Sequence, residues 1–265
     1  MAEEKKKRKL SKKARRRRRR KKIILTIEIL VILLLIPVIY VFYQMDRMQT
    51  TDIPDENIMV NDDFISENQD GYYNIALFGL DSREANLGKG THSDVIMIAS
   101  IHRKTKEVKL VSVYRDSYLQ MPGGECKKAT QAYFEGGPEK AINMLNTNLD
   151  LDIKDYIAVD FAAVANTINL LGGVEVDLTE DELYWINGYI DTTSSITGID
   201  ADALTTTGPQ TLDGIQAVAY ARIRYTEGDD YKRTERQRTV LSQALQKAQG
   251  ASIPTLLSIV DERCV

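Results

Sequence analysis

The chain has 265 residues and a formal net charge of −3, which is the sum of two unlike parts. Residues 1–22 carry 15 Lys or Arg and only two acidic residues, so the rest of the chain keeps 20 basic and 36 acidic residues, a net charge of −16. The length suits a single domain of ordinary size. Two cysteines and two histidines argue against a disulfide framework and against a zinc site of Cys and His ligands.

An apolar segment, residues 23–43, follows the basic tail at once and reads IILTIEILVILLLIPVIYVFY. About 20 apolar residues span a bilayer as a helix, and the positive-inside rule places the tail in the cytoplasm. We therefore expect an uncleaved signal anchor with the rest of the chain outside the cytoplasmic membrane. A cleaved signal peptide is the alternative, but residues 44–46 offer no small-residue cleavage site. The alternative for the basic tail is an arm that binds nucleic acid. Attraction of the tail to the anionic inner leaflet explains its charge without nucleic acid.

The segment after the predicted anchor, residues 44–71, is acidic and poor in large apolar residues, which is typical of an extended extracytoplasmic spacer. Residues 74–79 form a short apolar run that ends in a glycine and a polar loop, which predicts a buried strand. Residues 94–101 and 108–114 are rich in β-branched side chains and flank a charged turn. This pattern predicts a hairpin.

Helical and strand-like segments alternate in the middle of the chain. Apolar side chains recur with helical period from Pro138 to Leu149, and again over residues 161–171 before two glycines. Short strands are predicted at 156–159 and 174–178. The alternation predicts an α/β fold, a layered α-β-α domain with a central mixed or antiparallel sheet, over residues 72–250.

The last third of the chain begins with a polar, Thr-rich stretch, residues 191–207, which we interpret as a loop insertion. A helix over 211–221 and a final amphipathic helix over 232–249 are predicted to follow. Residues 253–259 look like the start of another helix. One interpretation is therefore that the C-terminal segment, residues 251–265, is truncated.

Arginines gather between these last two helices. Arg222 and Arg224 alternate on a strand-like stretch, which would place both side chains on one face. Arg233 and Gln237 follow at i and i+4 near a helix start, with Arg236 at i+3. Guanidinium donors match phosphate oxygens, and a helix N-terminus favours anions. The alternative is a solvated charged face, in which the arginines pair with neighbouring carboxylates: Glu227, Asp229, Asp230 and Glu235.

Two carboxylates are expected close to the arginines. Asp81 follows the first predicted strand, Asp94 begins the predicted hairpin, and Arg115 lies at the far end of that hairpin. Carboxylate oxygens hold hard cations such as Mg²⁺ or Mn²⁺. Together with the arginines, the two aspartates predict a site for a diphosphate and its metal ion.

Seven segments of the chain resemble, in order and spacing over residues 72–250, the successive motifs of the LytR-CpsA-Psr family. They are FGLDSR (78–83), SDVIMI (93–98), LVSVYRDSYL (110–119), YFEGGPEKAINML (133–145), LLGGVEVDL (170–178), GPQTLDGIQAVAYARIRY (208–225) and GDDYKRTERQRTVL (228–241). A single motif of this kind is weak evidence for a family, whereas seven motifs in the same order are specific evidence.

The resemblance implies a membrane-anchored phosphotransferase of a Gram-positive-type cell, with its catalytic domain outside. Such an enzyme attaches a polyprenyl-diphosphate-linked glycopolymer, of teichoic acid or capsule type, to peptidoglycan through a phosphodiester. The resemblance implies metal binding by Asp81 and Asp94, and catalytic roles for Arg115, Asp116 and Arg224. The residues that it implies for diphosphate binding are Arg83, Arg115, Arg222, Arg224, Asp230, Arg233 and Gln237. Lys127 or Lys128 matches a family lysine near the diphosphate, and no nucleic acid is implied.

In the implied reaction a sugar hydroxyl of the wall polymer attacks the diphosphate and lipid phosphate leaves. Asp116 or Asp94 is the candidate base. Apolar side chains that would line a slot for the prenyl chain, or simply belong to the core, are Ile142, Leu145, Val164 and Ile168. Two other functions stay open: a lipid diphosphate hydrolase, in which water replaces the sugar, and a non-catalytic protein that binds lipid-linked precursors.

Overall fold

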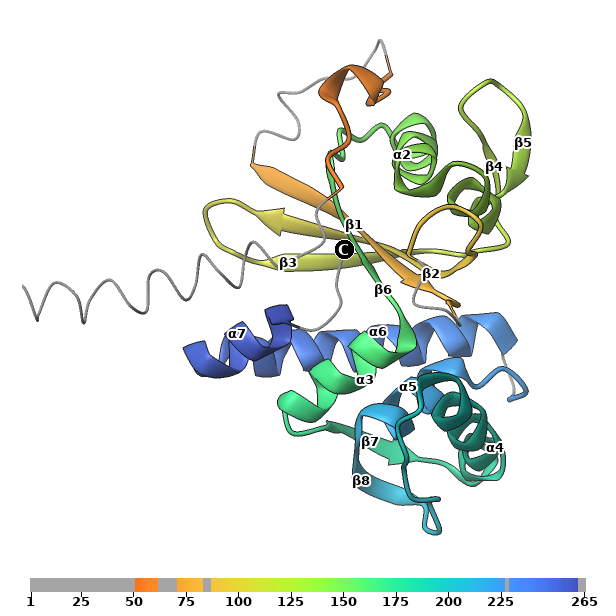
Figure 1. Ribbon diagram of the computed structural model, residues 1–265, viewed down its shortest axis with the longest axis vertical. Coiled ribbons are helices and arrows are strands. Elements are labelled where there is room, and N and C mark those ends of the chain that lie inside the picture. The colour runs from red at the N-terminus through yellow and green to blue at the C-terminus, as the bar shows by residue number, and fades with distance from the viewer. Residues whose placement is uncertain (1–50, 62–70, 83–86, 227–228, 262–265) are drawn as a thin grey trace, which may run out of the picture. The chain divides into compact units, whose positions relative to one another are not determined.

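A four-stranded sheet in the order β3-β2-β1-β6 forms the centre of the domain (Figure 1). The strands are β1 (Tyr72–Leu80), β2 (Ser93–His102), β3 (Val108–Val113) and β6 (Asp155–Val159). The β1–β2 and β2–β3 pairs are antiparallel, and the β1–β6 pair is parallel. The sheet is therefore mixed, and the hairpin predicted at 94–101 and 108–114 is confirmed.

The computed structural model describes residues 51–61, 71–82, 87–226 and 229–261, which belong to one compact unit. The predicted tail and membrane anchor, residues 1–43, lie outside the described residues. Within those ranges, no helix has the length and apolar character that a bilayer span requires.

An irregularity lies at the end of β1. The pairing with β2 shifts register between Gly79 and Leu80. Gly79 lies so close to the neighbouring strand that an added Cβ would be 2.9 Å from the Cβ of Val95. Bulges of this kind re-aim the end of a strand. The residue that follows is Asp81, the first of the predicted site residues.

Helix α2 (Ala129–Leu149) covers one face of the sheet and follows a short hairpin of β4 (Tyr118–Gln120) and β5 (Cys126–Lys128) (Figure 1). The helix is broken at Gly137, which has φ 67° and precedes Pro138. The helix predicted from Pro138 onward is thus the second half of a longer element. Fully buried side chains fill the space between α2 and the sheet, among them Phe78, Ile96, Tyr133, Met144 and Leu145.

The other face of the sheet carries a helical layer (Figure 1). Its elements are α3 (Phe161–Leu170), α4 (Glu180–Thr197), α5 (Gly214–Arg222), α6 (Asp229–Gln249), α7 (Ile253–Asp261) and the hairpin of β7 (Val174–Leu178) with β8 (Gly208–Leu212). A Cβ on Gly214 would lie 1.9 Å from the carbonyl oxygen of Ala165, so α3 and α5 are in backbone contact there. The α-β-α layering around a mixed sheet confirms the predicted fold class.

The loop insertion predicted at residues 191–207 is wrong for its first part, because α4 continues to Thr197. The helix begins with a capping box in which Thr179 and Glu182 exchange side-chain and backbone hydrogen bonds, and it ends at Gly198 in the left-handed region. Its second half is rich in Thr and Ser, which hid the helical period. The helix predicted over 211–221 also starts too early, since Leu212 ends β8 and Asp213 caps α5.

Residues 51–61, here called the N-terminal strap, lie against α2. Asn143 of α2 accepts a hydrogen bond from the backbone of Met59 and donates one to the carbonyl of Asn57, both at 2.8 Å. The side chains of Ile53 and Ile58 pack against the core beneath α2. The described part of the predicted spacer is thus attached to the domain along its length.

Candidate functional site

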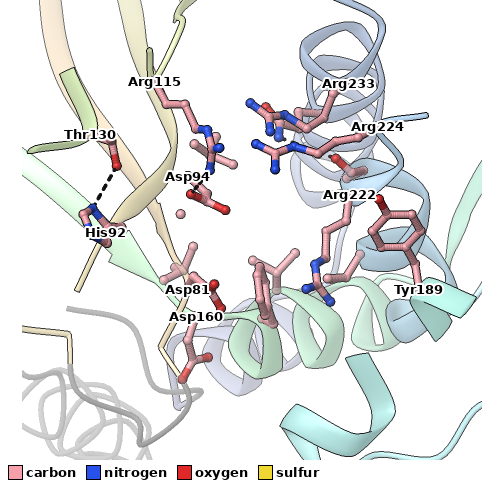
Figure 2. A pocket seen from close by; sticks show the side chains of 18 of the residues that line it. Asp81, His92, Asp94, Arg115, Thr130, Asp160, Tyr189, Arg222, Arg224 and Arg233 are labelled. Atoms are coloured by element: carbon pink, nitrogen blue, oxygen red, sulfur yellow. Dashed lines mark hydrogen bonds and ion pairs between the residues drawn. The ribbon is translucent and has the colours of Figure 1, made fainter. Parts of the chain in front are cut away.

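A cavity of about 590 Å³ opens where the sheet ends against α5 and α6, and predicted site residues from both sides line it (Figure 2). Asp81 follows β1, Asp94 lies in β2, and Arg115 follows β3. Because neighbouring antiparallel strands run in opposite directions, the end of β1 lies beside the start of β2 and near the end of β3. A hydrogen bond of 3.2 Å from the backbone N–H of Asp81 to the carbonyl of His92 closes this edge.

The sheet side of the cavity, here called the sheet wall, consists of Asp81, Asp94, Arg115, Asp116 and Lys128. Arg115 donates to Asp94 at 2.6 Å and to Asp116 at 3.4 Å, and Lys128 donates to the other oxygen of Asp116 at 2.7 Å. Most charges on this wall are therefore neutralised by a neighbour of opposite sign.

These ion pairs set the pKa values of the sheet wall. Burial tends to lower the pKa of the Arg115 guanidinium, but the charges of Asp94 and then Asp116 outweigh it, so the pKa is raised. The hydrogen bond from Lys128 is the largest cause of the lowered pKa of Asp116, to which Arg115 adds. A carboxylate with a lowered pKa is a weaker proton acceptor. The geometry therefore suits Asp116 to orienting Arg115 better than to acting as a base.

The helical side, here called the helix wall, consists of Arg222, Arg224, Arg233 and Gln237. Arg222 donates to the hydroxyl of Thr193 at 2.7 Å, and its guanidinium lies over the rings of Phe161 and Tyr189, 4.6 and 5.8 Å from their centroids. Figure 2 shows Arg224 and Arg233 pointing across the cavity toward Arg115. Arg224 and Arg233 therefore converge with Arg115 on a common space, while Arg222 lines the cavity from beside the rings.

Arg233 is the most deeply buried of these arginines, with 4% of its surface exposed. It forms an ion pair with Asp230 at 2.6 Å, while its Nε has no partner among the described residues. Burial lowers the pKa of Arg233, Asp230 opposes the shift, and the positive charges of Arg224 and Arg115 add to it. The helix wall thus crowds like charges that an anionic ligand would neutralise.

The strand-like stretch predicted to carry Arg222 and Arg224 is wrong in form, because Arg222 is the last residue of α5 and Arg224 follows in an irregular connection. The helical spacing of Arg233 and Gln237 holds, since α6 includes both and both line the cavity. Asp230 does not line it, but it holds Arg233. The alternative of a solvated charged face is excluded for Arg233 by its burial.

Arg236 lies close to Arg233 in sequence but serves a different purpose. It is buried, and its Nε donates to Glu182 at 2.7 Å. Its other nitrogens donate to the carbonyl of Ile223 at 3.1 Å and to the hydroxyl of Thr226 at 2.6 Å. Arg236 therefore fixes both ends of the short segment that carries Arg224.

Several other predicted residues are placed by the structure. Lys128 lines the cavity, whereas Lys127 pairs with Glu125 and Glu135, each at 2.8 Å. Arg83 lies outside the described residues. Of the four side chains considered for an apolar slot, Val164 lines the cavity and the other three, Ile142, Leu145 and Ile168, are fully buried in the two cores.

The sequence reasoning missed other residues of the cavity. Asp160 caps α3 through a 2.8 Å bond from the backbone of Ala163, and this helix start faces the cavity. His92 stacks on Phe134 at 4.4 Å. A carboxylate directly before an apolar helix is a capping signal that the sequence offers for Asp160. No sequence signal points to His92.

The two aspartates of the sheet wall suit a hard divalent cation. Oδ1 of Asp81 is buried and accepts no hydrogen bond from the described residues. Those residues contain no cluster of three or more His, Cys, Asp or Glu that would enclose a metal ion by themselves. Mg²⁺ commonly takes one or two carboxylates and completes its shell with water and substrate phosphate oxygens. Asp81 and Asp94 fit that pattern.

The fold and this cavity define an α/β domain with a charged cavity between a carboxylate-bearing sheet edge and an arginine-bearing helix pair. The chain belongs to the LytR_cpsA_psr family, whose sequence profile matches residues 38–262. The resemblance found in the seven segments is thereby confirmed.

Among curated proteins, the chain is similar to the polyisoprenyl-teichoic acid–peptidoglycan teichoic acid transferases TagU of Enterococcus faecalis and TagT of Bacillus subtilis. The identities are 32% over 177 residues (66% of this chain and 53% of TagU) and 31% over 196 residues (71% of this chain and 57% of TagT). The chain spans about half the length of these relatives.

Solved structures share the fold. TagT bound to LIIa-WTA superimposes with a TM-score of 0.59 at 22% identity, covering 80% of this chain and 83% of that one. The family protein YwtF (TagT) with bound octaprenyl pyrophosphate lipid gives 0.57 at 23% identity, covering 80% and 82%. At these identities the likeness establishes the fold.

Proposed function

We propose that this domain transfers a glycopolymer, of teichoic acid or capsule type, from a polyprenyl diphosphate carrier to peptidoglycan through a phosphodiester. The observation that carries the proposal is the convergence of Arg115, Arg224 and Arg233 on one cavity that also holds Asp81 and Asp94. The teichoic acid transfer for which TagU and TagT are named and the lipid bound to YwtF support it.

In the proposed complex the diphosphate lies between the two walls. Arg224, Arg233 and Arg222 contact its oxygens from the helix wall, and Arg115, held by Asp116, contacts it from the sheet wall. Asp81 and Asp94 would hold Mg²⁺ or Mn²⁺, which would supply positive charge to neutralise the diphosphate. Arg83, which follows Asp81 closely in sequence, is proposed as a further ligand.

The reaction is a displacement at phosphorus. A hydroxyl oxygen of the wall sugar forms a bond to the phosphorus that carries the glycopolymer, the bond from this phosphorus to the bridging oxygen breaks, and polyprenyl phosphate leaves with that oxygen. The hydroxyl proton goes to a carboxylate or to solvent. The arginines lower the barrier by holding the diphosphate in line and by stabilising charge on the leaving phosphate.

The apolar part of the same cavity gives the prenyl chain a place to bind. Val164 of α3, Val218 of α5 and Val240 of α6 line it beside the arginines. Apolar surface next to charged groups suits a ligand with a diphosphate head and a hydrocarbon tail. With residues 23–43 as a single membrane anchor and the tail in the cytoplasm, the domain would meet such a lipid outside the cell membrane.

The test is an assay of the full chain in lipid nanodiscs with a polyprenyl-diphosphate-linked saccharide and Mg²⁺. Release of polyprenyl phosphate should require a peptidoglycan oligosaccharide as acceptor, and the saccharide phosphate should become attached to it. Release without acceptor would identify a hydrolase instead. Binding without any release, with or without acceptor, would identify a precursor-binding protein.

A further inference from the structure

Three aromatic side chains form a continuous row that begins at the cavity. Tyr225 lines the cavity, its ring centroid lies 5.1 Å from that of Trp185, and Trp185 lies 5.0 Å from Tyr184. Tyr225 is 64% exposed and Tyr184 is 78% exposed. These three residues are called the aromatic platform below. The row joins two distant parts of the sequence, α4 and the connection after α5.

The aromatic platform is anchored at Trp185 and at the segment that carries Tyr225. Trp185 is half buried and packs against the core of the helical layer. Tyr225 lies inside the segment that Arg236 fixes through Ile223 and Thr226. Tyrosine and tryptophan side chains have only two rotatable bonds, so ordering such rings on a ligand costs little side-chain freedom.

A second hollow lies at the far end of the aromatic platform. Tyr184 lines it together with Glu180, Leu183 and residues 205–207, three consecutive threonines. Asn187 of α4 exchanges two hydrogen bonds of 2.9 Å with the backbone of Leu204, which holds the threonines beside α4. The hollow thus offers hydroxyl groups and one carboxylate next to an exposed ring.

The charges around this hollow select its ligand. Glu180 and the neighbouring Asp181 are exposed, and none of the described residues that line the hollow is basic. An anionic polymer segment would be repelled there. Sugar rings present C–H groups that pack on aromatic faces and hydroxyls that pair with threonine and carboxylate oxygens. A neutral saccharide fits both features.

We infer that Tyr184, Trp185 and Tyr225 bind the neutral sugar residues that directly follow the diphosphate in the donor. This inference rests on the proposed function, because it takes the diphosphate to lie against Arg224. Tyr225 is the next residue in the chain, so the row of rings starts where the first sugar leaves the diphosphate. The occupant is therefore the sugar of the donor rather than that of the wall acceptor.

The experiment compares the affinity of the full chain in nanodiscs for two probes, octaprenyl diphosphate and the same lipid diphosphate carrying a neutral N-acetylglucosamine disaccharide. Wild type should bind the disaccharide probe more tightly. Tyr184→Ala should weaken binding of that probe about fivefold to tenfold, as expected for loss of one ring contact, and leave octaprenyl diphosphate binding unchanged. Tyr118→Ala, at a 74% exposed tyrosine of β4, is the matched control.

Tyr225→Ala should weaken binding of the disaccharide probe at least as much as Tyr184→Ala does. Tyr225→Phe should retain the wild-type affinity for this probe because it keeps the ring. Equal affinities of wild type for the two probes, or no effect of either alanine variant, would overturn the inference. Normal donor binding by Tyr184→Ala with a raised KM for the peptidoglycan oligosaccharide would overturn it in favour of an acceptor site. A wild-type chain that binds neither probe would instead contradict the proposed function.

Discussion

The two walls of the cavity differ in how their charges are balanced. On the sheet wall, Arg115 lies between Asp94 and Asp116, and Lys128 completes the row of alternating charges. On the helix wall, Arg224 donates no hydrogen bond to any described residue, and Arg233 has a pKa lowered by burial and by nearby arginines. Most charges of the sheet wall are thus paired with one another, whereas the helix wall leaves positive charge that an anionic ligand would neutralise.

This difference assigns a task to each wall. Paired charges keep the geometry of the sheet edge fixed, which suits the holding of a metal ion at Asp81 and Asp94. On the helix wall, the positive charges of Arg224 and Arg115 help to lower the pKa of the buried Arg233, so these like charges repel one another. In the proposed reaction, a bound phosphate would reduce this repulsion, most of all when negative charge develops on the leaving group.

The largest effect is expected from the helix wall. Arg224→Ala should lower kcat/KM for transfer by about 100-fold to 1,000-fold, because it removes a donor aimed at developing charge. The melting temperature of the ligand-free protein should not fall, since one of several repelling charges is removed. Arg238→Ala, at an exposed arginine of the same helix α6 as Arg233, is the control and should leave both quantities unchanged. A variant that melts earlier would show that Arg224 stabilises the fold, which would break the distinction between the walls.

A substitution in the sheet wall should change how activity depends on the metal ion. Asp81→Asn keeps the shape of the side chain but removes its charge, so the Mg²⁺ concentration for half-maximal activity should rise about 10-fold to 100-fold. Titration of transfer activity with Mg²⁺ and with Mn²⁺ measures this half-maximal concentration. Asp177→Asn, at an exposed carboxylate of β7, is the control. An unchanged titration curve would remove Asp81 from the metal site.

The smallest effect concerns pH. The pKa of Asp116 is lowered from its ordinary 3.8, mainly by Lys128, so the stabilisation from this carboxylate is complete above pH 3.8 and is lost as the pH falls through the lowered pKa. Because Asp116 is 44% exposed, the contribution should stay below about 1 kcal/mol. Urea unfolding of wild type and Asp116→Asn should differ slightly at pH 7, and the two should converge as the pH falls below 3.8 and through the lowered pKa of Asp116. A difference that grows on acidification would contradict the ion-pair assignment.

Much of the sheet wall was predictable from the sequence, because strand ends and their polar residues obey local patterns. Asp81, Asp94 and Arg115 each follow or begin a β-branched run, and antiparallel pairing brings such ends together. The helix wall was predictable as a set of residues but not in shape, since Arg222 ends a helix instead of lying on a strand.

Other features depend on contacts that no local pattern encodes. Arg236 has the same helical spacing as the cavity residues, yet its side chain does not line the cavity. It donates a hydrogen bond to Glu182, 54 positions earlier in the chain. The contact of Trp185 with Tyr225 likewise joins two separate segments. The second half of α4 is hidden by Thr and Ser, whose propensity for helices is low but is overridden by the packing of Ile190 in the core.

The N-terminal strap determines how the domain would carry a mechanical load. Tension along the chain from its N-terminal side would reach the strap before it reaches β1, a central strand paired on both sides. The hydrogen bonds of Met59 and Asn57 to Asn143, and the packing of Ile53 and Ile58, would resist it first. Such a pull would thus act on α2 first, and the end of β1 that carries Asp81 would be spared.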